Sequence, residues 1–112
     1  MPTPYAYFKG EIMPTSEANL NIMTHALHYG TAVFEGVRGN WNEEDRCHYL
    51  FRVREHFERL GQSSKIMMLE LKESVDRLAE IAVELVEAGL WRPPRASART
   101  KPPWSAGRFW MC

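Results

Sequence analysis

The chain has 112 residues, of which 45% are apolar and 25% are charged, and fourteen basic residues balance fourteen acidic ones. This is the composition of a globular protein, and the length allows one compact domain but not two lobes around a large cofactor cleft. The two cysteines are too few for a disulfide framework and lie at no metal-ligand spacing, which favours a reducing, cytoplasmic compartment. No apolar run resembles a signal peptide or a membrane span, so we expect no membrane insertion.

A hairpin is the first predicted element. Aromatic and apolar residues at 5–8 and 11–13 flank Lys9 and Gly10, a glycine-containing turn that is typical of paired antiparallel strands. After a polar loop, residues 24–29 predict a single helical turn with Thr24 as its cap. Gly30 is expected to end this turn.

A second group of β-compatible residues follows. Residues 31–38 have a strand-like composition, and Gly36 and Gly39 within this region indicate bulges or a close approach of the backbone. Residues 40–45 are interpreted as a turn. Residues 47–53 predict a further strand that leads into a helix over residues 54–62.

The most regular pattern lies in residues 72–88, where apolar residues recur at spacings of three and four and predict an amphipathic helix that packs on the core. Glu73 and Arg77 stand four apart and predict an ion pair, and Gly89 is the expected stop. The predicted fold is α+β, with a mainly antiparallel sheet packed against two helices and followed by an irregular tail.

The tail, residues 91–112, differs from the rest of the chain. It contains five of the basic residues and no acidic one, with four of the seven prolines and three of the four tryptophans. It has the period of neither a helix nor a strand, so we expect no regular element there. We therefore divide the chain at residue 90.

Two histidines, His25 and His28, stand three apart and share a face of the predicted helical turn. Such a pair could ligate a metal, but no third ligand follows at a suitable spacing, so we expect structural histidines and no metal site. Their surroundings also contain a tyrosine, a glutamate and an arginine between glycines that would let a ligand approach the backbone.

The run His-Ala-Leu-His-Tyr-Gly at 25–30, followed by Val-Phe-Glu-Gly-Val-Arg at 33–38, resembles the amino-terminal signature of branched-chain amino-acid aminotransferases. These are fold-type IV pyridoxal-phosphate enzymes. The match extends from residues 7–11 through residues 52–60 and into residues 64–66. The related D-amino-acid aminotransferases and aminodeoxychorismate lyases typically carry Gly-Asp where this chain has Gly30 and Thr31, so the resemblance favours the branched-chain group.

The resemblance implies roles for five residues. It places Tyr29, Phe34, Gly36 and Arg38 at the substrate pocket, where aromatic rings receive an aliphatic side chain and the glycine leaves room for it. It makes Arg59 a contact of the cofactor phosphate, which suits a guanidinium because its fork of donors binds phosphate oxygens bidentately. The implied cofactor is pyridoxal 5′-phosphate, and the implied substrates are leucine, isoleucine or valine with 2-oxoglutarate.

Transamination in this family also needs a lysine that binds the cofactor covalently and a carboxylate near the pyridine nitrogen. Both come from the family's carboxy-terminal domain. None of the lysines of this chain stands in the family's context for that role: Lys9, Lys65, Lys72 and Lys101. By resemblance, residues 1–90 are a truncated small domain, and we expect the chain alone to be inactive and to hold no catalytic residue.

The family continues after the long helix with a strand containing Ile-Arg-Pro, whereas this chain changes at Trp91 to Arg-Pro-Pro-Arg. We interpret residues 91–112 as disordered or as read from a shifted frame. Two alternatives stay open. One is a non-catalytic subunit that docks onto a full-length enzyme or forms a homo-oligomer. The other, less favoured, is a binding module whose basic, tryptophan-bearing tail neutralises the phosphates of a nucleic acid and stacks on its bases.

Overall fold

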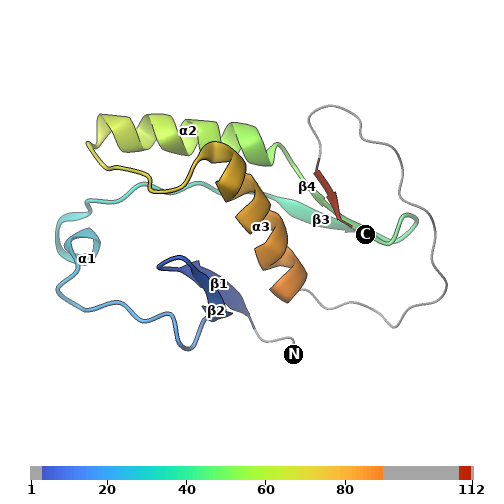
Figure 1. Ribbon diagram of the computed structural model, residues 1–112, viewed down its shortest axis with the longest axis horizontal. Coiled ribbons are helices and arrows are strands. Elements are labelled where there is room, and N and C mark those ends of the chain that lie inside the picture. Colours follow the sequence, from blue (N-terminus) through green and yellow to red (C-terminus); the bar gives the residue numbers. More distant parts are fainter. Residues whose placement is uncertain (1–3, 90–108, 112) are drawn as a thin grey trace.

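The computed structural model describes residues 4–89 and 109–111. Two long helices, α2 (Val53–Ile66) and α3 (Val75–Gly89), cross each other, and the hairpin of β1 (Tyr5–Phe8) and β2 (Glu11–Pro14) packs on α3 (Figure 1). A second sheet lies beyond the start of α2. The predicted α+β fold is confirmed, with the strands in two separate antiparallel sheets.

The hairpin forms as the sequence predicts. Tyr5 pairs with Pro14 and Phe8 pairs with Glu11 across the antiparallel ladder. Lys9 and Gly10 have φ values of 53° and 96°, so both central residues of the turn lie in the left-handed region that a tight hairpin of this twist requires. The Tyr7 hydroxyl donates a hydrogen bond of 3.1 Å to Glu73, which ties the hairpin to the segment before α3.

The short helix α1 (His25–Tyr29) also forms, and Gly30 ends it with a φ of 66°. Thr24 is the N-cap residue, as predicted, but its side chain makes no capping hydrogen bond. The Thr24 hydroxyl donates to the carbonyl oxygen of Asn21 at 2.6 Å, so it stabilises the preceding turn and is not bonded to the helix.

Residues 31–38 form no strand, which corrects the expectation from their composition. In Figure 1 the chain between α1 and β3 runs alongside α2, so this segment has a helix as its neighbour where a strand would need a hydrogen-bonding partner. Its junction with the second sheet is fixed by a bond of 2.9 Å from the Phe51 amide to the Arg38 carbonyl.

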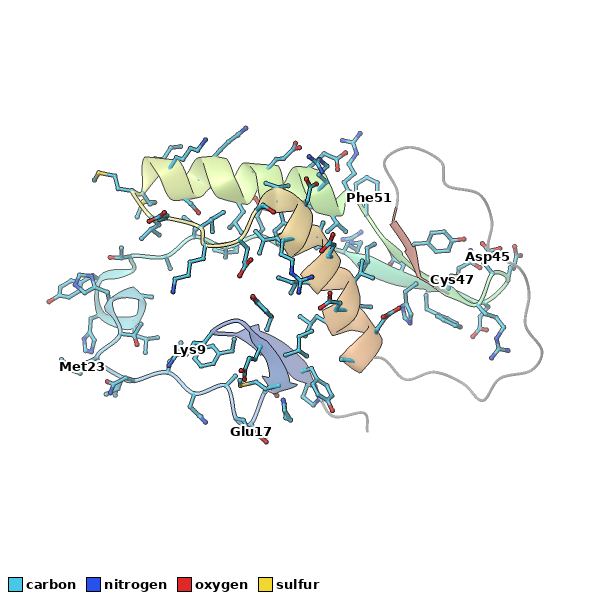
Figure 2. All side chains as sticks on the ribbon, in the orientation of Figure 1. Lys9, Glu17, Met23, Asp45, Cys47 and Phe51 are labelled. Carbon is cyan, nitrogen blue, oxygen red and sulfur yellow. The ribbon has the colours of Figure 1, made fainter. Side chains whose placement is uncertain are left out.

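The second sheet has the order β3 (Gly39–Asn42), β4 (Cys47–Leu50) and β5 (Phe109–Met111). The predicted turn over 40–45 was too long, because residues 40–42 pair with β4, and the predicted strand over 47–53 ends three residues earlier. Asp45 lies in the shorter turn and Cys47 opens β4 (Figure 2). At Gly39 an added Cβ would lie 2.9 Å from Leu50 Cδ2, which confirms the close approach predicted there.

Strand β5 contradicts the expectation that residues 91–112 contain no regular element. Its pairing with β4 joins Leu50 to Phe109 and His48 to Met111. Residues 90–108 and 112 lie outside the described residues, so the expectation of disorder or of a shifted frame is not tested there.

Both long helices differ from their predicted bounds. Helix α2 starts one residue earlier and continues four residues beyond the predicted end, and Gly89 is the last residue of α3, where a left-handed stop was expected. The predicted Glu73–Arg77 pair is also wrong, because Arg77 Nη1 lies 3.1 Å from Glu80 and 2.9 Å from Glu84.

The hydrophobic core is small and lies where the second sheet meets the two helices. Leu50, Val53 and Ala79 are its buried members. Partly buried neighbours come from both helices and from the segment before β3: Val37, Phe57, Ala82, Val83 and Val86. No helix in the described part of the chain is long and apolar enough to cross a membrane.

Candidate functional site

The extended segment over residues 31–38 has two faces. Burial alternates along it: Thr31, Val33, Glu35 and Val37 are partly buried, and the residues between them are exposed. Such a period of two is that of an extended backbone, on which successive side chains point to opposite sides. Val37 packs against the core and anchors one face, so the exposed face is turned away from it.

The exposed face carries three of the residues assigned by resemblance to the substrate pocket, Phe34, Gly36 and Arg38. Phe34 is 92% exposed, and an added Cβ at Gly36 would meet no other atom within 4 Å. The sequence prediction grouped these residues, and the structure places them on one side of one segment. They form an open surface, and a closed pocket would need an opposing wall from other residues.

Tyr29, the fourth of these residues, is exposed at the end of α1. Its ring centroid lies 4.6 Å from that of His25 and 6.4 Å from that of His28. His25 Nδ1 also lies 3.4 Å from the Thr31 hydroxyl oxygen. Within residues 4–89 no three potential ligands gather into a metal site.

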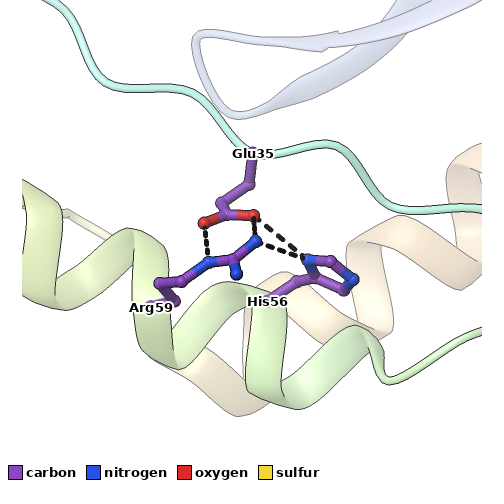
Figure 3. Close-up of polar contacts among 3 residues, drawn as sticks. All are labelled: Glu35, His56 and Arg59. Carbon is purple, nitrogen blue, oxygen red and sulfur yellow. Dashed lines mark hydrogen bonds and ion pairs between the residues drawn. The ribbon is translucent and has the colours of Figure 1, made fainter.

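Glu35, on the inner face of the segment, binds two side chains of α2 (Figure 3). Arg59 Nε lies 2.5 Å from Glu35 Oε1, and Arg59 Nη2 lies 2.6 Å from Oε2, so the guanidinium and the carboxylate meet in a bidentate pair. His56 Nδ1 lies 3.0 Å from the same Oε2. We refer to Glu35, His56 and Arg59 as the Glu35 cluster.

The donors and acceptors of the Glu35 cluster follow from its geometry. An ionised carboxylate only accepts hydrogen bonds, so His56 Nδ1 must carry the proton that it shares with Glu35. Arg59 Nη2 and His56 Nδ1 lie 3.5 Å apart and are then both donors, so no hydrogen bond joins them. Hydrogen bonds from Arg59 and then from His56 lower the pKa of Glu35 to about 2, so it is ionised at neutral pH.

Sequence reasoning singled out Arg59 and missed both of its partners. One signal was present, because His56 and Arg59 are three apart and therefore share a face of a helix. Glu35 lies 24 residues before Arg59, and no pattern within the sequence reports a contact across that distance.

Arg59 keeps donors that a ligand could use. A guanidinium has five N–H donors, and the contacts with Glu35 involve only Nε and Nη2. Nη1 has no hydrogen bond among the described residues, and it carries no dashed contact in Figure 3. Because the Arg59 side chain is 64% exposed, an anion can reach it, and the site fits the phosphate group of the cofactor that the resemblance implies.

No protein-family profile matches this chain. A probable branched-chain-amino-acid aminotransferase from Aquifex aeolicus is 44% identical over 82 residues, which are 73% of this chain and 26% of that protein. The branched-chain aminotransferase from Thermoproteus uzoniensis, solved with norvaline, has a TM-score of 0.74 at 34% identity over 80% of this chain and 30% of its own. The PLP form of the Thermobaculum terrenum enzyme has a TM-score of 0.72 at 32% identity, over 81% of this chain and 30% of its own.

The chain is homologous to the amino-terminal small domain of branched-chain-amino-acid aminotransferases. It spans about a quarter of the length of the curated relatives that it matches. The resemblance drawn from the sequence motifs is therefore confirmed for the family and for the part of it that this chain represents. The roles of the individual site residues stay predictions.

Proposed function

We propose that this chain supplies part of the substrate wall and one phosphate contact of a pyridoxal-phosphate-dependent branched-chain aminotransferase. The proposed reaction moves the amino group of leucine, isoleucine or valine to 2-oxoglutarate. The observation that carries the proposal is the geometry of the Arg59 guanidinium. Its Nε and Nη2 groups donate to Glu35, while its remaining donors stay accessible. Homology to enzymes of this name supports the choice of reaction.

The proposed substrate wall is the exposed face of residues 31–38 together with Tyr29. The rings of Tyr29 and Phe34 offer apolar surface to an aliphatic side chain, and Gly36 leaves space beside Phe34. Burying an isopropyl or isobutyl group against such a wall is worth about 1.5 to 3 kcal/mol, enough to favour branched aliphatic substrates over short ones. Arg38 adds an exposed cation to the same face.

Bound pyridoxal phosphate would supply the electron sink for amino transfer. The residues of this chain contribute binding and orientation: Arg59 would hold the phosphate, and the exposed face of residues 31–38 would position the substrate. The lysine and carboxylate that complete the family's chemistry match no position here. Lys9, for example, lies 5.1 Å from the centre of the Phe8 ring in the hairpin turn. We therefore propose that the 112-residue chain alone does not catalyse transamination.

The proposed phosphate contact predicts a preference for phosphorylated ligands. Pyridoxine 5′-phosphate and pyridoxine suit the test, because neither carries an aldehyde that would react with surface lysines. Titration of the chain by calorimetry should show that the phosphorylated ligand binds roughly tenfold more tightly, and Arg59→Met should abolish the difference. Arg77→Met is the matched control, since it also removes a carboxylate-bound arginine but lies on α3. Equal affinities for both ligands in the wild-type chain would contradict the phosphate contact.

The same preparation tests the proposal that the chain alone does not catalyse transamination. The chain, mixed with pyridoxal phosphate, leucine and 2-oxoglutarate, should form no glutamate above the rate of the cofactor in buffer. Robust glutamate formation by chain free of contaminating enzyme would overturn this part of the proposal.

A docking role is the second candidate, and exposed apolar side chains favour it. Large apolar residues around α1 and the following segment are mostly exposed: Leu20, Ile22, Met23, Leu27, Tyr29 and Phe34. Apolar surface of this kind marks contacts with other polypeptide. A subunit that docks onto a full-length enzyme should co-purify with it, a homo-oligomer should elute above 13.0 kDa in size-exclusion chromatography, and a chain that does neither lacks this role.

Three further assignments rest on composition alone. We propose a shifted-frame origin for residues 91–112 from their change in charge and proline content. The cytoplasmic location stays a prediction of the sequence, and the disulfide-bonded state of Cys47 does not support its premise of reduced cysteines. Nucleic-acid binding by that tail stays the less favoured prediction, because such a composition more often marks a segment without a binding role. Residues 90–108 lie outside the described part of the chain.

A further inference from the structure

We propose that Glu35 is a positioning residue: its carboxylate holds both the Arg59 guanidinium and the segment that presents Phe34 and Gly36. The inference deepens the proposed function and rests on it where ligand binding is concerned. Glu35 would touch neither cofactor nor substrate. Its role is to connect the proposed phosphate contact on α2 to the proposed substrate wall.

The first step of the argument is the contrast in burial within the segment. The Glu35 side chain is only 9% exposed, whereas the neighbouring Phe34 is 92% exposed. A carboxylate is rarely buried unless it is paired. Here both oxygens are satisfied, Oε1 by Arg59 Nε and Oε2 by Arg59 Nη2 and His56 Nδ1.

The second step concerns what holds residues 31–38 in place. Among the strands that the structure describes, none pairs with this segment, and its backbone bond to Phe51 lies at its end, at Arg38, so ladder hydrogen bonds do not fix residues 33–37. Side chains of its inner face must anchor it, and Glu35 supplies the charged anchor beside the apolar contact of Val37. Because Phe34 and Gly36 are the immediate neighbours of Glu35, fixing its backbone also fixes theirs.

The third step concerns Arg59. A long side chain that is 64% exposed has many rotamers available, and ordering it on ligand binding costs conformational entropy. The bidentate contact with a nearly buried partner fixes the guanidinium beforehand. Arg54 and Glu58 on the same helix form a simpler pair, with a separation of 3.2 Å and about half of each side chain exposed. The Arg54–Glu58 pair lies within α2, and Arg54 also binds Asp76 of α3, but neither contact reaches residues 31–38.

The test compares Glu35→Gln with the wild-type 112-residue chain, both labelled with ¹⁵N. In the wild type, backbone order parameters of residues 33–37 should be near 0.85, roughly the value of rigid backbone, and in Glu35→Gln they should fall below about 0.6. The preference for pyridoxine 5′-phosphate over pyridoxine should fall by roughly threefold to tenfold in the same variant. Glu58→Gln is the matched control, since it removes the carboxylate of the Arg54 pair and should change neither quantity.

Arg59→Lys keeps the positive charge but cannot make the bidentate contact. This second variant tests the anchoring role of Glu35 if Glu35→Gln is unfolded, as a loss of dispersion in its amide spectrum would show. It should also lower the order parameters of residues 33–37. Unchanged order in a folded Glu35→Gln or in Arg59→Lys, or an equal loss in Glu58→Gln, would overturn the inference. A wild-type chain that binds both pyridoxines equally would refute the proposed phosphate contact, while loss of order in Glu35→Gln would still support the anchoring role.

Discussion

Replacing Leu50 by alanine should lower the free energy of unfolding by about 2 to 5 kcal/mol. Leu50 ends β4 and is 6% exposed, and it packs with Val53 and Ala79 in the small buried core. The truncated side chain would leave a cavity between the sheet and the helices. Small domains have a total stability of only about 5 to 15 kcal/mol, so the variant should be largely unfolded at modest urea concentrations.

Urea denaturation followed by circular dichroism measures this change. Phe51→Ala is the matched control, because the next residue in the chain is 59% exposed and its structural bond to Arg38 is made by the backbone amide (Figure 2). The control should change the free energy of unfolding by less than about 0.5 kcal/mol. Equal losses in the two variants would show that the core is not centred on Leu50.

Acid should destabilise the wild-type chain more than it destabilises Glu35→Gln. The folded pKa of Glu35 is lowered from 4.5 to about 2, chiefly by the hydrogen bonds from Arg59 and also by that from His56. A lowered folded pKa stabilises the folded state at pH values above the unfolded pKa, and this stabilisation is lost as the pH falls toward the folded value. The wild type should therefore lose stability between about pH 4.5 and pH 2 through this group, and Glu35→Gln should lack that component.

Urea midpoints of both proteins at several pH values provide the comparison. The difference between wild type and variant separates the contribution of Glu35 from that of the rest of the protein. Glu17→Gln replaces an exposed carboxylate outside the Glu35 cluster and serves as the control (Figure 2). Parallel pH profiles for wild type and Glu35→Gln would contradict the strong pairing of Glu35 with Arg59.

The sequence predicted elements whose signals are local. The hairpin follows from Lys9 and Gly10, which provide two successive left-handed residues, and the end of α1 follows from Gly30. Residues 31–38 were misassigned because strand-like composition does not reveal whether a pairing strand is available. Strand β5 was missed for a related reason: its pairing with β4 joins segments about 60 residues apart, and composition alone favoured an irregular tail.

In the candidate site, too, local features could be predicted from the sequence and contacts between distant segments could not. The resemblance located Tyr29, Phe34, Gly36, Arg38 and Arg59, and four of them lie on exposed surface of α1 and the following segment. What the sequence could not give is the contact of Glu35 with α2, since a carboxylate in an extended segment has many possible partners. The alternation of burial identifies Glu35 as the charged member of the motif that faces inward, beside Val33 and Val37.

The alternating faces of residues 31–38 have a consequence for how this surface tolerates mutation. Exchanging an outward side chain such as Phe34 leaves the inward contacts of Glu35 and Val37 in place. Deleting one residue between Thr31 and Phe34 would instead swap the two sides, exposing the carboxylate and burying the ring. Substitutions can thus change what the outer side recognises, whereas the length of the segment is constrained by its attachment to α2.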